Sequence, residues 1–311
     1  MTKSFCELLR QYYPKPSEAD DFNSTFIANC VLNSFLSYTA IMLNIVTIHA
    51  IRKTPSLPKT LKTLLLSLAV SDVGVGLLVQ PLYSSVLVKW LQQNNPGCNT
   101  AKAFYVVAHL FFNSSFSNVV AVSVDRFLAI HLHLRYHEHV THKRVVSLVI
   151  SIWLLSLLIS LTPLWLPSQI FNPIIVTLAF VGLVFIAMVY IRIYLTVRRH
   201  NGQIHTLQVQ HGTKTGEKAQ FAILVKSAFG TFYVYLLLLI CYLPHLICMA
   251  VIEVNGTRIA LKKLFLLSMT LVFLNSVLNP VIYCWKMRPI RRIITDIGRN
   301  VISWLSNRSS H

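Results

Sequence analysis

AFYVVAHLFFNSSFSNVVAVSVDRFLAI, residues 103–130, carries one adjacent pair of opposite charges, Asp125 and Arg126, followed by Phe127, in an otherwise uncharged and largely apolar run. The run exceeds the roughly 20 residues that an α-helix needs to cross a bilayer. An ionised Asp or Arg at the centre of a membrane helix costs about 2.5–3.5 kcal/mol on an insertion scale. The charge pair near the end of this segment therefore indicates a functional site.

Six further segments of the 311-residue chain are long and apolar enough to span a membrane. They cover residues 26–51, 61–88, 145–166, 174–197, 221–252 and 264–285. The chain is 54% hydrophobic and 12% charged, with a mean hydropathy of +0.59, which is not the balance of a soluble domain. We predict an all-α membrane protein with a seven-transmembrane helix bundle at 26–285, an amino-terminal segment at 1–25 and a cytoplasmic segment at 286–311.

The basic residues indicate the orientation of this bundle. A net charge of +18 and a pI near 9.9 would also suit a nucleic-acid-binding protein. With the amino terminus outside, however, only eight of the 28 Lys and Arg residues fall on the outer side. They are Lys3, Arg10, Lys15, Lys89, Lys102, Arg258, Lys262 and Lys263. Because positive residues stay on the cytoplasmic side, we predict an extracellular amino terminus, a plasma-membrane location and no nucleic-acid partner.

Two N-glycosylation sequons fall on the outer side in this threading, at Asn23-Ser24-Thr25 and Asn255-Gly256-Thr257. We therefore expect glycosylation at Asn23 and Asn255.

The last segment contains NSVLNPVIY, residues 275–283. Its proline removes a backbone donor and kinks the helix, and the preceding asparagine can bond the freed groups. With the Asp-Arg-Phe triplet and single polar or aromatic residues in other spans, this string resembles the rhodopsin-like (class A) G-protein-coupled receptors over about residues 26–302. The matching residues outside the string are Asn44, Asp72, Asp125, Arg126, Phe127 and Trp153. The resemblance implies a receptor, not an enzyme, whose partners are an extracellular ligand and a heterotrimeric G protein.

The resemblance assigns a signalling switch to one set of positions. These are Asp125, Arg126, Phe127, Tyr190, Tyr242, Pro244, Asn279, Pro280 and Tyr283. Arg126 is expected to be held by Asp125 at rest, and Tyr190 and Tyr283 to converge near it on activation, although both tyrosines also suit an interfacial position. The family often has an acid at the inner end of helix six, where this chain has Leu224. We therefore predict that Arg126 lacks a lock to helix six and that basal signalling is appreciable.

The resemblance also implies a sodium pocket. It falls on Asp72, Ser115, Asn275, Ser276 and Asn279. One carboxylate with hydroxyl and amide oxygens suits a hard cation. The alternative is a protonated, hydrogen-bonded Asp72, and we expect no other cofactor.

By position, the family's ligand pocket has an apolar lining that includes two histidines. The lining is Tyr105, Ala108, His109, Phe112, Tyr242, His245, Met249, Met269 and Phe273. Such a pocket favours a small, neutral or weakly anionic, partly apolar ligand, including a lipid-like one. The alternative is that His109 and His245 are core residues.

Several positions depart from the family pattern. Cys98 lies three residues too far from Arg126 for the usual disulfide, and an alternative bridge among Cys6, Cys30 and Cys98, such as Cys6 to Cys98, is open. The second outer loop, 167–172, is too short for a hairpin lid, and Gly182 replaces the usual proline of helix five. These departures resemble melanocortin receptors.

The stretch VYIRIY, residues 189–194, instead resembles adenosine receptors. We place the chain in the branch of melanocortin, adenosine, cannabinoid and lysophospholipid receptors without choosing among them. The acids that bind melanocortin peptides fall on Leu82, Ala101 and Tyr105, and the adenosine-binding asparagine falls on Met249. Neither ligand can be inherited directly, and a melanocortin-like peptide receptor remains the alternative.

A non-receptor transporter is a weaker alternative, because transporters show repeats or broken helices. Residues 199–220 read as a flexible cytoplasmic connector. Beyond the seventh segment, isoleucines recur at helical spacing between arginines, which predicts a short amphipathic eighth helix on the membrane surface.

Overall fold

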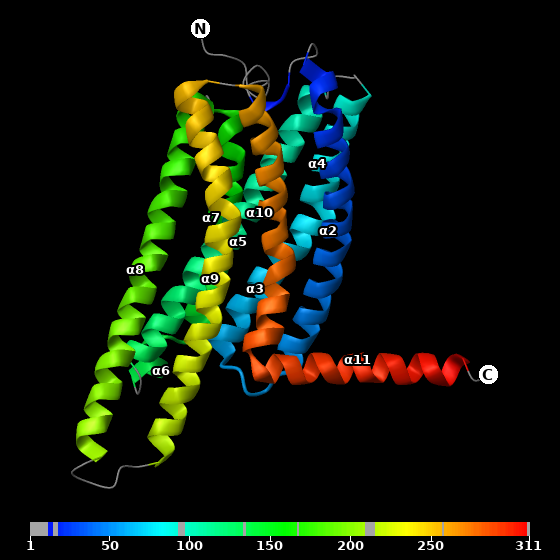
Figure 1. Cartoon of the computed structure of the whole chain (residues 1–311). Helices are drawn as coiled ribbons and strands as arrows, with labels where there is room; N and C mark the ends of the chain where they lie inside the picture. Colours follow the sequence, from blue (N-terminus) through cyan, green and yellow to red (C-terminus); the bar gives the residue numbers. More distant parts are fainter. Residues whose placement is uncertain are drawn as a thin grey trace.

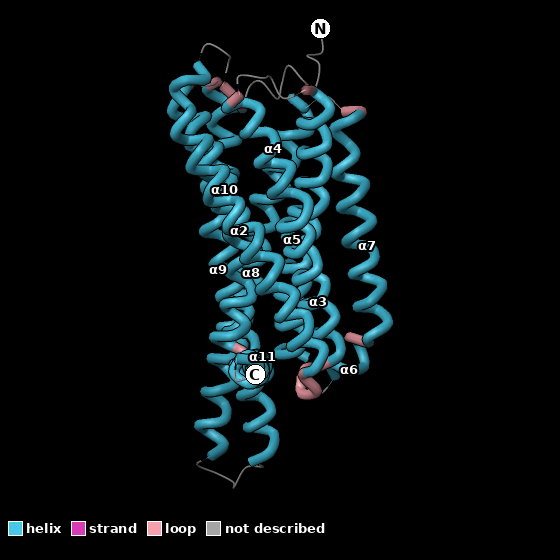
Figure 2. The backbone as a smooth tube through the Cα atoms, turned by 90° about the vertical axis from the view of Figure 1, so that its right-hand side faces the viewer, coloured by secondary structure: helices cyan, strands magenta, loops and turns pink. Residues whose placement is uncertain are grey.

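The computed structural model describes residues 12–14, 18–92, 97–132, 135–166, 168–208, 215–256 and 258–309. Within these ranges the chain is almost entirely helical, and they contain no strand. Seven long helical spans run side by side, and a further helix, α11 (Arg288–Ser309), crosses one end of the bundle (Figures 1 and 2). We call this end the α11 end and the opposite one the N-terminal end.

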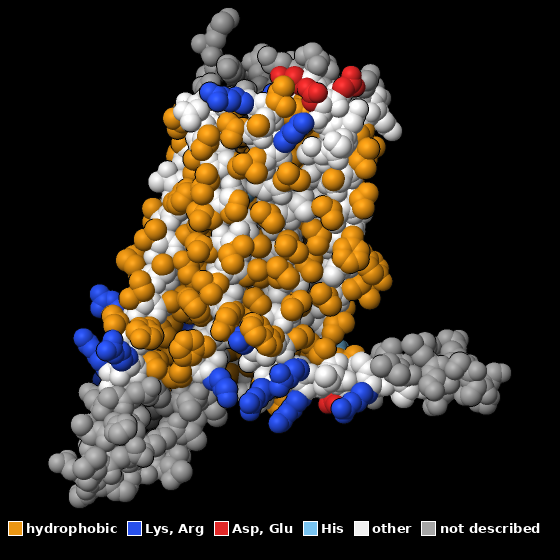
Figure 3. All heavy atoms as spheres, viewed as in Figure 1, with side chains coloured by type: hydrophobic (Ala, Val, Ile, Leu, Met, Phe, Trp, Pro, Cys, Tyr) orange, Lys and Arg blue, Asp and Glu red, His pale blue; other side chains and the backbone are white. Residues whose placement is uncertain are grey.

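All seven spans are long and apolar enough to cross a membrane, which confirms the predicted fold. The spans are α2 (Ala19–Lys53), α3 (Lys59–Gly74) continuing through a π-helical stretch (Val75–Val79) into α4 (Gln80–Leu91), α5 (Cys98–Leu132), α7 (His142–Leu161), α8 (Ser168–Gln208), α9 (Thr215–Asn255) and α10 (Ile259–Lys286). A one-turn helix, α6 (Tyr136–His139), follows α5, and α11 (Arg288–Ser309) follows the last span. Apolar side chains cover the flank of the bundle (Figure 3), as a lipid-facing surface requires.

The second span is irregular before Pro81. Proline has no N–H to donate and its ring crowds the preceding turn, and the π-helical stretch ends two residues before it, at Val79. Gly76, within this stretch, accepts a hydrogen bond on its carbonyl from Ser37 Oγ of α2 at 2.8 Å. A Cβ at Gly76 would lie 2.8 Å from the Ile41 side chain, so glycine permits the close approach of the two helices.

Three expected segment ends are wrong. Residues 199–220 are not a connector throughout, because α8 continues to Gln208 and α9 begins at Thr215, so both helices extend beyond the bundle (Figure 1). The expected outer loop at 167–172 is shorter still, because α8 begins at Ser168. The first helix begins at Ala19 rather than near residue 26, since Asp20 and Asp21 in its first turn complement the helix dipole.

The amphipathic eighth helix is present as α11. Ile290 is buried and Ile293 is half-buried, and Arg291 and Arg292 between them are exposed. Pro289 occupies the second helical position, where its missing N–H costs nothing.

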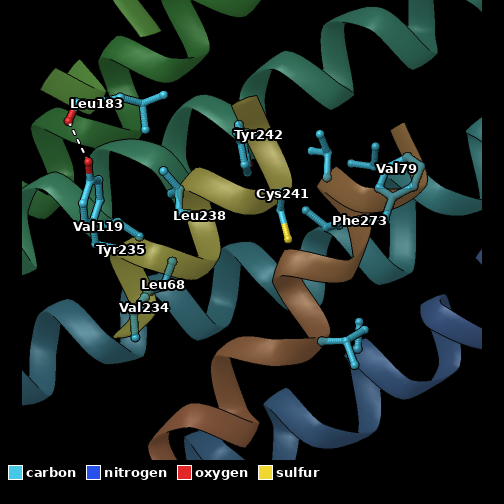
Figure 4. Packing of buried hydrophobic residues seen from close by; sticks show 14 of the residues in the cluster. Leu68, Val79, Val119, Leu183, Val234, Tyr235, Leu238, Cys241, Tyr242 and Phe273 are labelled. Carbon is cyan, nitrogen blue, oxygen red and sulfur yellow. Dashed lines mark hydrogen bonds between the residues drawn. The ribbon is translucent and has the colours of Figure 1, made fainter. Parts of the chain in front are cut away.

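The centre of the bundle is packed around α9 (Figure 4). Leu238, Cys241 and Tyr242 of α9 are buried there. Tyr235, also on α9, donates a hydrogen bond to the Leu183 carbonyl of α8 at 3.2 Å. Phe273 of α10 lies opposite, with no exposed surface. This apolar layer separates a polar cluster at the α11 end from a cavity at the N-terminal end.

Candidate functional site

Near the α11 end, Asp125 and Arg126 form a buried ion pair, with 4% and 2% of their side chains exposed. Arg126 Nε lies 3.0 Å from Asp125 Oδ2, and Nη2 contacts the same oxygen. The other carboxylate oxygen accepts a hydrogen bond from the Tyr136 hydroxyl of α6 at 2.5 Å. Tyr136 also bonds Thr60 Oγ1 of α3 at 2.9 Å. Burial and the Asp125 charge raise the pKa of Tyr136, so this hydroxyl stays a proton donor.

Arg126 is also tied to helix six of the bundle, α9. Its Nη1 donates to Ser227 Oγ at 3.2 Å. The prediction that Arg126 lacks a lock to helix six is therefore wrong: Leu224 supplies no acid, but Ser227, one turn later on the same face, accepts a hydrogen bond. A guanidinium has five donors and a hydroxyl has free lone pairs, so an acid is not required for the contact.

Tyr190 and Tyr283 are both buried but neither bonds Arg126. The Tyr190 hydroxyl accepts from Ser123 Oγ of α5 at 3.3 Å. The Tyr283 hydroxyl is buried without a partner among the described residues. Phe127, the third residue of the triplet, is half-buried and its ring stacks on His131 with centroids 5.3 Å apart.

Tyr242 of α9 lines the cavity toward the N-terminal end and lies two residues before Pro244, which is inside the same helix. Its ring lies 6.3 Å from that of Phe112 and 6.4 Å from that of Phe116, both of α5. Gly182 explains the position of Phe116, since a Cβ at Gly182 would lie 2.7 Å from the Phe116 ring. The glycine that replaces the usual proline thus makes room for an aromatic contact at Tyr242.

Asp72 is fully buried, and one of its oxygens accepts a hydrogen bond from Asn279 Nδ2 at 2.9 Å. Asn279 immediately precedes Pro280, inside α10. Four of the five predicted sodium-pocket residues have a buried side-chain oxygen that has no hydrogen-bond partner among the described residues. These atoms are Asp72 Oδ1, Ser115 Oγ, Asn275 Oδ1 and Asn279 Oδ1. Ser276, the fifth, is held to α2 through its carbonyl, which accepts from Asn44 Nδ2 at 2.9 Å.

This oxygen set fits a small hard cation, which prefers carboxylate, hydroxyl and amide oxygens. A proton on Asp72 would supply only one donor to the group. The residues present are therefore those that a sodium ion would need.

A cavity of about 270 Å³ opens toward the N-terminal end. Eight of the nine predicted pocket residues line it: Tyr105, Ala108, His109, Phe112, Tyr242, His245, Met249 and Met269. Phe273 does not line it. Its ring packs deeper, 5.3 Å from that of Tyr83 and 5.9 Å from that of Phe112, because α10 turns this position toward the second span.

The two cavity histidines have internal contacts. His245 Nδ1 lies 2.9 Å from Ser268 Oγ of α10. The His109 ring lies 4.2 Å from that of Tyr105 and 5.5 Å from that of Phe171. Each histidine is therefore oriented by a neighbour while it still lines the cavity.

Sequence reasoning missed four residues at the outer mouth of the cavity. Tyr12, Tyr13 and Asn172 line it, and Glu253 is hydrogen-bonded to two of them. Tyr12 and Tyr13 lie in an amino-terminal segment without periodicity, and Asn172 lies in a range predicted to be loop. Of these four residues, Glu253 is the one that the sequence marks, because it is an acid at the end of an apolar segment.

The N-terminal end also has a buried ion pair and a disulfide-bonded cysteine. Lys262 of α10, with 3% of its side chain exposed, pairs with Glu18 at 2.9 Å. Cys98 is disulfide-bonded, whereas Cys30 is free, and Cys6 lies outside the described residues. Asn23 and Asn255 both have exposed side chains at this end.

Comparison with known proteins places this arrangement in a family. The sequence model of the 7 transmembrane receptor (rhodopsin family) matches residues 43–173 and 168–283. The adenosine receptor A2b of Gallus gallus is 26% identical over 300 residues, covering 84% of this chain and 85% of the relative. The adenosine receptor A3 of Ovis aries is 24% identical over 291 residues, covering 86% and 88%. The adenosine receptor A2a of Homo sapiens is 25% identical over 299 residues, covering 85% and 70%. The chain therefore belongs to the rhodopsin family of seven-transmembrane receptors, which are G-protein-coupled receptors and not enzymes.

Proposed function

We propose that this protein is a plasma-membrane receptor that binds a small extracellular ligand in the 270 Å³ cavity and activates a heterotrimeric G protein at the α11 end. The observation that carries the proposal is the contact between Arg126 and Ser227, which joins α5 to α9 below the cavity. Most Lys and Arg side chains visible on one face lie at the α11 end (Figure 3), which supports a cytoplasmic position for that end. The opposite end is then extracellular, where Asn23 and Asn255 are accessible for glycosylation.

Tyr242 and the two α5 phenylalanines beside it connect the cavity to the switch. A ligand that displaces these rings shifts α9 relative to α5, because the rings line the cavity and form the contact between the two helices. Separation of α9 from α5 breaks the bond between Ser227 and Arg126 and frees the guanidinium to face the G protein. Tyr190 and Tyr283, already buried nearby, then supply hydroxyls that can meet it.

The ligand that this cavity favours is small, neutral and partly apolar. Its lining is mostly aromatic and aliphatic, and the Glu253 carboxylate at the mouth repels an anion, which argues against the weakly anionic class. The matched relatives are adenosine receptors, but Met249, which lines the cavity, offers a thioether where the adenosine-binding asparagine would lie. We therefore do not propose adenosine itself.

The test is nucleotide exchange on purified G proteins by the full-length receptor in nanodiscs, with a library of lipids, nucleosides and peptides. We expect exchange above that of empty nanodiscs and a further rise with at least one neutral, partly apolar compound. Arg126→Ala should abolish both. If neither basal nor ligand-dependent exchange on any Gα subtype exceeds the Arg126→Ala level, the receptor proposal is wrong.

We further propose that sodium binds around Asp72 in the resting receptor, supported by the four buried oxygens that lack a hydrogen-bond partner in the described part of the chain. A ligand that binds only the folded state stabilises it, by about 2.7 kcal/mol at one hundred times its Kd. Thermal unfolding of the purified receptor should therefore occur at higher temperature in sodium chloride than in N-methylglucamine chloride at equal ionic strength. Asp72→Asn should remove this difference, and an equal difference in Asp72→Asn would refute the site.

A further inference from the structure

Four polar side chains from four segments meet at the mouth of the cavity. The Tyr12 hydroxyl donates to Glu253 Oε1 of α9 at 2.5 Å. Asn172 Nδ2 of α8 donates to the Tyr12 oxygen at 3.1 Å and to Glu253 Oε1 at 3.2 Å. Tyr105 of α5 donates to Asn172 Oδ1 at 2.8 Å. We call Tyr105, Asn172 and Glu253 the outer subsite, and Tyr12 is its occupant.

The outer subsite has the character of a site for a hydrogen-bond donor. Its carboxylate has no Lys or Arg partner among the described residues. Glu253 Oε1 instead receives two neutral donors. Asn172, with 2% of its surface exposed, is oriented by Tyr105 so that its amide nitrogen faces the same point. The Glu253 carboxylate is half-buried, and the oxygen that faces the cavity mouth is the one that receives both donors, so loss of the Tyr12 hydroxyl leaves a place for another donor.

Tyr12 enters the cavity from the amino-terminal segment as a ligand would. Its side chain is 5% exposed, and its ring packs on Phe265 of α10 with centroids 4.9 Å apart. Burial, followed by the bond and charge of Glu253, raises the pKa of Tyr12, so its hydroxyl remains a donor at physiological pH. Its neighbour Tyr13 stacks on Trp90 of α4 at 6.4 Å and its hydroxyl has no hydrogen bond to a described residue. Among the described residues, the Tyr12 hydroxyl is therefore the one of the two that is held by hydrogen bonds.

We propose that Tyr12 is a tethered competitor in the ligand cavity, and that the receptor's ligand carries an aromatic hydroxyl that replaces the Tyr12 hydroxyl at Glu253 and Asn172. This rests on the proposed ligand cavity and names the class of compound that fills it. An apolar body of the ligand extends toward Tyr242, and its hydroxyl is held at the mouth. Because a tethered group competes at an effective concentration in the millimolar range, the amino-terminal segment sets the threshold for the free ligand.

The probe for this subsite is 4-methylphenol, the tyrosine side chain as a free molecule, with toluene as the matched compound without the hydroxyl. Binding is measured by ligand-observed NMR titration of the full-length receptor in nanodiscs, which requires no G protein. We expect 4-methylphenol to bind Tyr12→Ala about tenfold more tightly than the wild type, from the loss of the competing hydrogen bond to a charged acceptor. In Tyr12→Ala it should also bind several-fold more tightly than toluene.

Two further variants complete the test. Adding Glu253→Ala to Tyr12→Ala should remove the preference for 4-methylphenol over toluene. Tyr12→Phe, which keeps the packing on Phe265, should bind 4-methylphenol more tightly than the wild type does, whereas Tyr13→Phe should bind it with wild-type affinity. If Tyr12→Ala does not fold, the comparison of these two variants tests the proposal. Equal affinity of 4-methylphenol for the wild type, Tyr12→Ala and Tyr12→Phe, or no preference over toluene, overturns the proposal. Absence of G-protein activation in the separate exchange assay overturns the proposed function and leaves this binding result standing.

Discussion

Replacing Ser227 by alanine removes the hydroxyl that accepts from Arg126 and should raise basal signalling. A hydrogen bond to a charged group contributes about 1.5–3 kcal/mol when buried. Ser227 is half-buried near the α11 end, where water replaces part of the lost bond, so we expect about 1–1.4 kcal/mol. That amounts to roughly a fivefold to tenfold shift of the resting-to-active ratio toward the active state.

The assay is basal nucleotide exchange on G protein by the purified receptor, normalised to receptor amount. Leu224→Glu, which restores an acid one turn away, should lower basal exchange below that of the wild type. Thr196→Ala serves as the matched control, because its hydroxyl donates to the Arg192 carbonyl of its own helix, at 2.9 Å, and to no side chain among the described residues. Basal exchange that stays at the wild-type level in both Ser227→Ala and Leu224→Glu would refute the argument that α9 is restrained through Arg126.

Three further outcomes are expected. Tyr136→Phe should raise basal exchange by roughly threefold to tenfold, since one hydrogen bond to Asp125 is lost. Because the pKa of Tyr136 is raised, the wild type should keep this bond, and hence its low basal exchange, from pH 6 to 9. A rise of wild-type basal exchange within that pH range would contradict the role of Tyr136. Gly182→Ala should lower the thermal unfolding midpoint through about 1–3 kcal/mol of overpacking, and adding Phe116→Leu should recover most of the loss; an unchanged midpoint in Gly182→Ala would rule out the steric role. Glu18→Gln should lower the thermal unfolding midpoint, because the buried Lys262 loses its charged partner. Adding Lys262→Met should raise the midpoint again, as replacing a buried ion pair by apolar groups often does. Equal thermal midpoints for the single and the double variant would argue against the ion pair.

The fold was predictable because its main determinants are local in sequence. Each of the seven apolar segments satisfies its backbone hydrogen bonds within itself, which is the only way that a single segment can cross hydrocarbon. Segment ends were less predictable: the polar residues of 199–220 read as a connector, yet α8 and α9 continue through much of this range.

The candidate site was predictable only where a motif marks a residue. Asp72 and Asn279 meet at 2.9 Å, as matched motif positions imply. Ser227 and Tyr12 belong to no motif, and no pattern of spacing relates Tyr12 to Glu253, which lies 241 positions later in the chain.

The amino-acid sequence by itself determined a membrane protein with seven spans, the side on which its basic residues gather, and a charge pair at the end of the third span. These follow from hydropathy and charge, which act residue by residue. Only the tertiary structure decided what Arg126 is bonded to and what occupies the cavity mouth. Those contacts join side chains from different helices, and their partners are chosen by helix rotation, close approach at glycines and packing, none of which can be read along a single segment.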